Sequence, residues 1–259
     1  MLIPVAGADD PRLATFRALK GPETDPTTFV VEGEKLLRRL LALRIPLHSL
    51  LVSDRWLPRL AELLPADVPA YVADHAVLPA VIGFRFHRGV LARAFRPPPP
   101  NLDDLLVRSA RLLACPEVAD PANFAAMVRS AAALGWDGVL VGPNAPDAFS
   151  RRCVRVSMGA TLQLPVATVP APPGGAALAC VRRLQAAGFR CLAAAASSAA
   201  ALPEVPSGKL ALVLGNEDEG LPPAAAAACD ARVGVAMAAG VDSLNVAVAA
   251  GILLHRYRG

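Results

Sequence analysis

Two polar loops near the C-terminus contain the side chains best suited to chemistry, and each follows a short apolar segment. The apolar run Leu210–Leu214 leads into the polar stretch Gly215–Gly220. A second apolar segment, Val233–Met237, leads through small residues to Asp242 and Ser243. In an open α/β sheet, ligands bind outside the carboxyl ends of the strands. Carboxylates, amides and a hydroxyl after two strand ends therefore predict a ligand site.

The segment after the second loop is expected to form a helix that begins at Asp242 or Ser243, since both residues favour the N-cap position. The run Leu244–Leu254 is apolar on almost every side of such a helix. A helix of this kind has to be buried all round, which one face of a sheet cannot achieve. Its small side chains, from Ala247 to Gly251, would let a second backbone approach closely.

Both loops resemble known motifs. GNEDEGLP and VAMAAGVDSLNVAVAAGILL are similar to the second and third motifs of the SpoU family of RNA ribose 2′-O-methyltransferases, which belongs to the SPOUT superfamily. The first motif of that family is an Asn followed six residues later by an Arg, and Asn123 and Arg129 match it. Asn123 is also a candidate N-cap for the helix that carries Arg129. The chain departs from the family pattern at Ala125, Asp218 and Ala236, where the family usually has Gly, Gly and Pro.

The resemblance implies a fold, a cofactor and a site. The fold is α/β, with a C-terminal parallel-sheet SPOUT domain that contains a deep trefoil knot. The cofactor is S-adenosylmethionine, and no metal is implied. The relatives dimerise through the C-terminal helix and the knot region, so we expect a homodimer. The implied catalytic residues are Asn123, Arg129, Glu217, Ser243 and Asn245, and the implied cofactor-binding residues are Leu214, Gly215, Asn216, Gly220, Val235, Met237 and Leu244.

A ribose 2′-hydroxyl is a weak acid, so its activation has to be assigned to particular groups. Family comparison gives this role to Arg129, but a guanidinium in a protein stays protonated. We therefore expect a cationic Arg129 that grips the adjacent phosphate and stabilises the developing alkoxide, with phosphate or water removing the proton. Glu217 has a second interpretation, as a carboxylate that pairs with Asn123 or orders its loop. Ser243 also has a second interpretation, in which it only caps the helix that follows.

The first part of the chain alternates strands and helices and predicts a small α/β/α unit. FVVEGEKLLRRLL and HRGVLARA resemble the RNA-binding domain of the ribosomal protein L30e type that precedes many SpoU catalytic domains. The candidate RNA contacts are basic side chains beside these segments, and an equally good alternative is that they are solvated surface charges. They are Arg38, Arg39, Arg85, His87 and Arg88.

The proline run near residue 98 marks the boundary between the two parts. A run of four prolines favours an extended, semi-rigid spacer. We therefore expect an L30e-like RNA-binding domain over residues 1–96, a linker over 97–104 and a SPOUT methyltransferase domain over 105–259. The net charge of +4 and the pI near 9.0 suit a polyanionic partner only modestly.

The composition of the sequence argues against membrane, secreted, disulfide-rich and zinc-binding proteins. No apolar stretch reaches the length of about 18 residues that suggests a membrane span, and the start of the chain lacks the pattern of a secretion signal, so we expect a cytoplasmic protein. The five cysteines include no CxxC pair, which argues against a disulfide framework and a zinc site.

Two other functional classes compete with RNA methylation as interpretations of the sequence. A dinucleotide-binding oxidoreductase would need GxGxxG after a strand, which the chain lacks. A non-catalytic RNA-binding or ribosome assembly factor with the same fold stays open, as does transfer RNA in place of the ribosomal RNA that the L30e-like domain favours.

Overall fold

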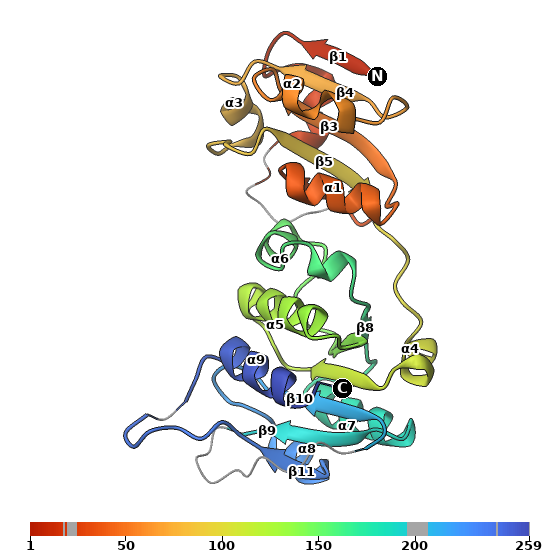
Figure 1. The fold of residues 1–259 in the computed structure, drawn as a ribbon, viewed down its shortest axis with the longest axis vertical. Coiled ribbons are helices and arrows are strands. Elements are labelled where there is room, and N and C mark those ends of the chain that lie inside the picture. Colours follow the sequence, from red (N-terminus) through yellow and green to blue (C-terminus); the bar gives the residue numbers. More distant parts are fainter. Residues whose placement is uncertain (18, 20–24, 196–206, 242, 259) are drawn as a thin grey trace. The chain divides into compact units, whose positions relative to one another are not determined.

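The computed structural model divides the chain into two compact units. It describes residues 1–17, 19, 25–195, 207–241 and 243–258. The first unit comprises Met1–Pro98 and Phe149–Arg155, and the second comprises Pro99–Ala148 and Val156–Gly259. Figure 1 shows the elements of both. In the described part of the chain, no helix is both long and apolar enough to cross a membrane.

The first unit is built on a five-stranded mixed sheet in the order β1-β4-β3-β5-β2. Parallel pairs join β1, β4 and β3, and antiparallel pairs join β3, β5 and β2. The elements are β1 (Leu2–Val5), η1 (Pro11–Phe16), β2 (Thr28–Glu32), α1 (Glu34–Ala42), β3 (Leu47–Ser53), α2 (Leu57–Leu60), η2 (Ala61–Leu63), β4 (Ala70–Ala73), α3 (Leu78–Ile82) and β5 (Val90–Phe95). This is a small α/β unit, and its likeness to the L30e type stays a prediction.

The second unit holds a six-stranded sheet in the order β11-β9-β10-β6-β7-β8, with every pairing parallel. The parallel α/β fold predicted for the C-terminal part is therefore confirmed, while the trefoil knot stays a prediction. The elements that follow the proline run are α4 (Leu102–Arg108), β6 (Arg111–Cys115), α5 (Pro121–Ala133), β7 (Gly138–Val141), α6 (Arg151–Val156), η3 (Ala160–Leu162), β8 (Val166–Thr168), α7 (Ala176–Ala186), β9 (Arg190–Ala194), β10 (Leu210–Val213), α8 (Pro223–Ala228), β11 (Ala231–Val233) and α9 (Val246–Arg256).

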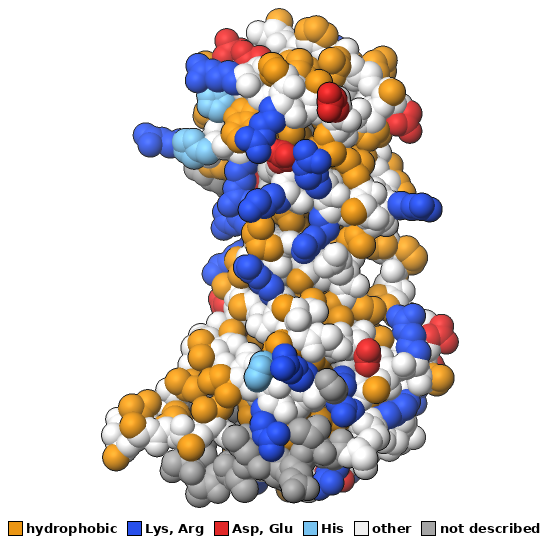
Figure 2. All heavy atoms as spheres, in the orientation of Figure 1, with side chains coloured by type: hydrophobic (Ala, Val, Ile, Leu, Met, Phe, Trp, Pro, Cys, Tyr) orange, Lys and Arg blue, Asp and Glu red, His pale blue; other side chains and the backbone are white. Residues whose placement is uncertain are grey.

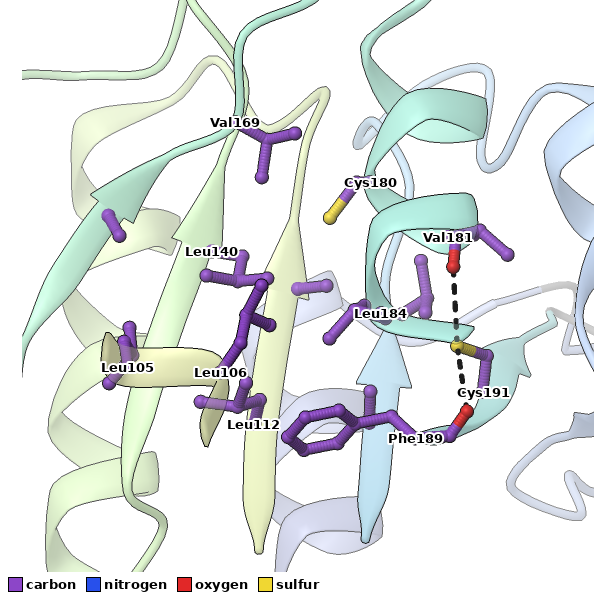
Figure 3. Packing of buried hydrophobic residues seen from close by; sticks show 14 residues of the cluster. Leu105, Leu106, Leu112, Leu140, Val169, Cys180, Val181, Leu184, Phe189 and Cys191 are labelled. Atoms are coloured by element: carbon purple, nitrogen blue, oxygen red, sulfur yellow. Dashed lines mark hydrogen bonds between the residues drawn. The ribbon is translucent and has the colours of Figure 1, made fainter. Parts of the chain in front are cut away.

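Strands β6, β7, β9 and β10 are short apolar runs because both faces of a parallel sheet are covered. Helix α7 covers one face through Cys180 and Leu184, which pack with Phe189 and strand residues in a continuous buried cluster (Figure 3). The thiol of Cys191 lies in the same cluster and donates to the carbonyl oxygens of Val181 and Phe189 at 3.9 Å each. Burial raises the pKa of Cys180 to about 12, so this thiol is held as an inert packing group.

Segment Phe149–Arg155 packs in the first unit although it lies beyond the proline run. The Phe149 ring lies 5.1 Å from the Phe29 ring, and the Arg96 guanidinium lies over its face at 5.5 Å. Arg151 forms an ion pair with Glu32, which is only 6% exposed. The sequence division at 97–104 assigns this segment to the C-terminal domain. The structure differs because the buried Glu32 carboxylate takes its cation from this segment.

Candidate functional site

A cleft of about 470 Å³ opens at the carboxyl ends of β9, β10 and β11. Its wall includes all seven residues expected to bind the cofactor, together with Glu217 and Ser243. The wall also contains residues that the sequence did not single out, from β9, α8, β11 and α9. The lining residues are Ala193, Ala194, Ala195, Leu214, Gly215, Asn216, Glu217, Asp218, Glu219, Gly220, Leu221, Pro223, Ala226, Arg232, Val235, Met237, Ser243, Leu244, Val246, Ala249 and Leu253.

The loop after β10 is closed at its neck by backbone contacts. Asn216 and Gly220 exchange two backbone hydrogen bonds of 3.0 Å. A Cβ atom on Gly215 would lie 2.0 Å from the carbonyl carbon of Gly220, so only glycine permits this approach. Gly220 itself has a φ of 70°. The two glycines of the second motif are therefore explained by the shape of the loop.

The side chain of Asn216 stabilises the same loop and joins it to the segment after β6. Its Oδ1 accepts from the backbone N–H of Asp218 at 2.9 Å, and its Nδ2 donates to the carbonyl oxygen of Glu117 at 3.2 Å. Among the described residues other than glycine, only Arg44 and Met158 have a positive φ. Asp218 therefore replaces the usual glycine without needing a left-handed backbone.

Helix α5 begins earlier than the sequence suggested. The prediction that Asn123 caps this helix is wrong, because Asp120 is the N-cap and Pro121 is the first helical residue. The Asp120 carboxylate accepts from the backbone N–H groups of Ala122 and Asn123, both at 2.8 Å. Asn123 is thereby released from capping, and its side chain is available for a tertiary contact.

Helix α9 begins later than expected. The prediction of a cap at Asp242 or Ser243 fails, since Asn245 is the N-cap and Asp242 lies outside the described residues. Asn245 Oδ1 accepts from the backbone N–H of Ala247 at 2.9 Å and of Val248 at 3.4 Å. Ser243 is left on the exposed wall of the cleft, with its hydroxyl free of a capping role.

One chain of hydrogen bonds joins the three motifs. Asn245 Nδ2 donates to Asn123 Oδ1 at 3.0 Å, and Asn123 Nδ2 donates to Glu217 Oε1 at 3.3 Å. The Glu217 carboxylate also accepts from the backbone N–H groups of Ala119 at 3.4 Å and Asp120 at 3.2 Å. Glu217 thus ties the loop after β10 to the start of α5, as the second interpretation of this carboxylate required.

Arg129 lies outside this chain of hydrogen bonds. It is exposed on α5, and among the residues that the structure describes it has no hydrogen bond or ion pair. Helix α5 packs along α9, where Ser130 Oγ lies 3.8 Å from the position of a Cβ atom on Gly251. The guanidinium is therefore free to bind an anion beside the helix that carries Asn123 at its start.

Basic side chains gather on the first unit, and Figure 2 shows many of its Lys, Arg and His side chains on one visible face. Arg38 is paired with Glu34 at 2.9 Å, and Glu34 also binds Arg59 at 2.8 Å. The Arg59 guanidinium lies 5.3 Å from the centre of the Trp56 ring. Arg59 was missed because its partner Glu34 is distant in sequence, and no local pattern marks it.

The other expected RNA contacts differ in exposure. Arg85, His87 and Arg88 are exposed in the loop before β5, and Arg39 is partly buried on α1. Arg88 lies across Gly33, where a Cβ atom would come within 3.2 Å of Arg88 Cβ. Arg88 is therefore placed at the start of α1, where Gly33 is the N-cap.

Comparison with known proteins places these features in context. Residues 110–255 match the model of the SpoU rRNA methylase family. An uncharacterised tRNA/rRNA methyltransferase of Mycobacterium tuberculosis is 36% identical over 97% of this chain and 90% of its own length. A 23S rRNA (guanosine(2553)-2′-O)-methyltransferase of Bacillus subtilis is 30% identical over 93% of this chain and 92% of its own. The crystal structure of an AdoMet-bound rRNA methyltransferase from Sinorhizobium meliloti superposes with a TM-score of 0.82 at 25% identity, covering 99% of this chain and 97% of that one.

Proposed function

Because the chain belongs to the SpoU rRNA methylase family and is thus an S-adenosylmethionine-dependent RNA methyltransferase, we propose that it methylates a ribose 2′-hydroxyl of ribosomal RNA. The observation that carries the proposal is the hydrogen-bonded chain from Asn245 through Asn123 to Glu217 beside the cleft. Ribosomal RNA is favoured over transfer RNA because the Bacillus subtilis relative is named for 23S rRNA.

The cleft fits S-adenosylmethionine in size and in the groups that it presents. Its volume lies within the range of about 300–1,000 Å³ found for small-molecule sites. The closed loop Gly215–Gly220 offers backbone groups at a fixed position, as binding without side-chain specificity requires. Leu214, Val235 and Met237 add apolar wall for the adenine ring. When bound, the cofactor supplies an electrophilic methyl group.

Side chains of the protein then position the ribose of the RNA. Arg129 binds the phosphate next to the target hydroxyl and stabilises negative charge on the oxygen as its proton leaves to phosphate or water. Asn123 and Glu217 hold the start of α5 against the cofactor loop, which sets where that arginine is presented. Ser243, which lines the cleft, contacts the ribose or the cofactor.

We also propose that the protein acts as a homodimer through α9. Val248 and Ile252 lie one helical turn apart on α9 and are 53% and 42% exposed, and Leu244, just before the N-cap Asn245, is 37% exposed. Together they form an exposed apolar stripe on the single chain. The expectation that this helix is buried all round is not met within one chain. A second copy would cover the stripe, and Leu244 would connect that interface to the cleft wall.

The first unit would hold the RNA by its phosphates. Arg38 and Arg59 both pair with Glu34, which keeps the two guanidinium groups in fixed directions, and Arg88 lies across the neighbouring Gly33. Arg39, Arg85 and His87 extend this basic surface. Phosphate contacts of this type give affinity and register without reading sequence.

The test is a map of ribose methylation across total RNA from cells with and without the gene. The proposal predicts one 2′-O-methylated nucleotide in ribosomal RNA that disappears with the gene. Loss of a mark in transfer RNA would move the substrate to that class. Unchanged RNA, together with calorimetric binding of NAD in place of S-adenosylmethionine, would contradict the proposed reaction.

A further inference from the structure

The charges around the cleft are unevenly distributed. Glu217, Asp218 and Glu219 form one lip, in the loop that follows β10. Arg232, on β11, is the only Lys or Arg among the described lining residues. Strand β9 lies between β10 and β11, so the acidic lip and the guanidinium project from strands about 10 Å apart. The cleft therefore has a negative side and a positive side.

Arg232 lines the cleft and is available to bind a ligand there. Its backbone is in register with Ala193 of β9, whose side chain also lines the wall. The residue is exposed, and no hydrogen bond or ion pair joins its side chain to another described residue. In contrast, Glu217 on the opposite lip is committed to the start of α5. A guanidinium that has no partner among the described residues of a ligand cleft is available for an anionic group of the ligand.

The chemical form of S-adenosylmethionine matches this polarity. The molecule carries a sulfonium and an ammonium group, which are cations, and a single carboxylate. Asp218 and Glu219 suit the cations, and Arg232 suits the carboxylate, which a planar guanidinium can bind through two parallel hydrogen bonds. We propose that Arg232 binds the cofactor carboxylate and so selects S-adenosylmethionine over ligands that lack this group. The inference rests on the proposed use of this cleft for the cofactor.

A natural analogue of the cofactor lacks only the carboxylate that Arg232 is proposed to bind. Decarboxylated S-adenosylmethionine keeps the adenosine, the sulfonium and the amine but lacks the carboxylate. The experiment is calorimetric titration of both ligands into the wild-type full-length protein and into Arg232→Ala, Arg232→Lys and Arg190→Ala. Arg190 is a matched control, because it is an exposed arginine at the opposite end of β9, outside the cleft. Comparing the two ligands within each variant cancels the attraction of the acidic lip for a more positive ligand.

The expected result is a loss confined to one ligand. Arg232→Ala should weaken S-adenosylmethionine about tenfold, as for one charge-assisted contact at a partly solvated site, and should leave the decarboxylated ligand within about twofold. Arg232→Lys should recover part of the loss because it keeps the charge but not the planar donor pair. Arg190→Ala should match the wild type with both ligands.

Three outcomes would overturn the inference, and each has a distinct meaning. Equal losses for both ligands would mean that Arg232 supports the cleft without touching the carboxylate. An unchanged affinity for both, with weaker RNA binding by Arg232→Ala, would place the guanidinium on an RNA phosphate. Failure of the wild type to bind S-adenosylmethionine at all would remove the proposed function itself, and the inference with it.

Discussion

Replacing Asn245 with aspartate separates two roles that the wild-type side chain combines. Asn245 Oδ1 caps α9, while Nδ2 donates to Asn123 Oδ1 at 3.0 Å. Aspartate is as good an N-cap as asparagine but has no N–H to donate. Asn245→Asp should therefore keep the helix and break the chain of hydrogen bonds that joins the three motifs.

The structure also shows why Asn123 cannot compensate by turning its amide. In its present orientation Asn123 would face the new carboxylate with Oδ1, which is repulsive. Turned over, it would face that carboxylate with its N–H groups but point Oδ1 at the Glu217 carboxylate, which accepts its amide at 3.3 Å now. Either way one hydrogen bond is lost and an acceptor pair is left facing each other, at a cost of about 1–2 kcal/mol. Turnover should fall about 5- to 30-fold, the change in rate that such a free energy corresponds to.

The assay compares Asn245→Asp with Asn245→Ala and Asn123→Ala. Turnover is measured at saturating RNA and cofactor, and thermal melting reports the fold. Asn245→Asp should melt about 2–8 °C below the wild type, because the lost hydrogen bond costs the folded state about 1–2 kcal/mol. Asn245→Ala loses the cap as well, at about 1 kcal/mol, and should melt about 2–4 °C lower still. Adding Asn245→Asp to Asn123→Ala should cost little more than Asn123→Ala alone. Wild-type turnover in Asn245→Asp, or fully additive losses in the double variant, would refute the reasoning.

Three further predictions address other parts of the molecule. Arg129→Ala and Arg129→Lys should both lose most turnover, at least about 100-fold, with cofactor affinity nearly intact by calorimetry; near-normal turnover in the lysine variant would remove the phosphate-gripping role. Ile252→Arg should give monomers with weakened cofactor binding by light scattering and calorimetry, while Val107→Arg, at a 77% exposed apolar residue on α4, should match the wild type in both; a monomeric wild type with full activity would refute the dimer. The pKa of Asp25 is held below its usual value, first by hydrogen bonds from Thr27 and Thr28 and then by the Arg93 charge. Its stabilising effect is complete above the unfolded pKa of about 3.9 and is lost as pH falls below it, so the melting temperature should drop more between pH 5 and pH 3 in the wild type than in Asp25→Asn, and equal drops would contradict this account.

The sequence predicted the parallel sheet and the strand that leads to the cofactor loop because both depend on local patterns. Short apolar runs that end in glycine are sufficient to place β10 and the turn at Gly215. Helix starts were less reliable, since several capping residues stand close together. Before α5, Asp120 followed by Pro121 was the stronger signal, because proline suits the first helical position. At α9, Asn245 caps the helix and Ser243 does not, because the loop continues for two more residues.

Long-range pairings could not be read from the sequence at all. The ion pair between Glu32 and Arg151 joins residues on opposite sides of the proline run, and no local pattern at either residue predicts it. The hydrogen bond between Asn123 and Asn245 likewise depends on how α5 packs along α9. The charges opposite each other across the cleft, on the acidic loop and at Arg232, became visible only with the strand order β11-β9-β10.

The most direct test of the central claim is the chemical position of the transferred methyl group. The purified protein is incubated with ribosomal RNA and S-adenosylmethionine carrying an isotopically labelled methyl group, and the RNA is digested to nucleosides for mass spectrometry. The account predicts label on a ribose 2′-oxygen with the wild type and almost none with Arg129→Ala. Label on a base, or no transfer by a wild type that binds the cofactor, would contradict it.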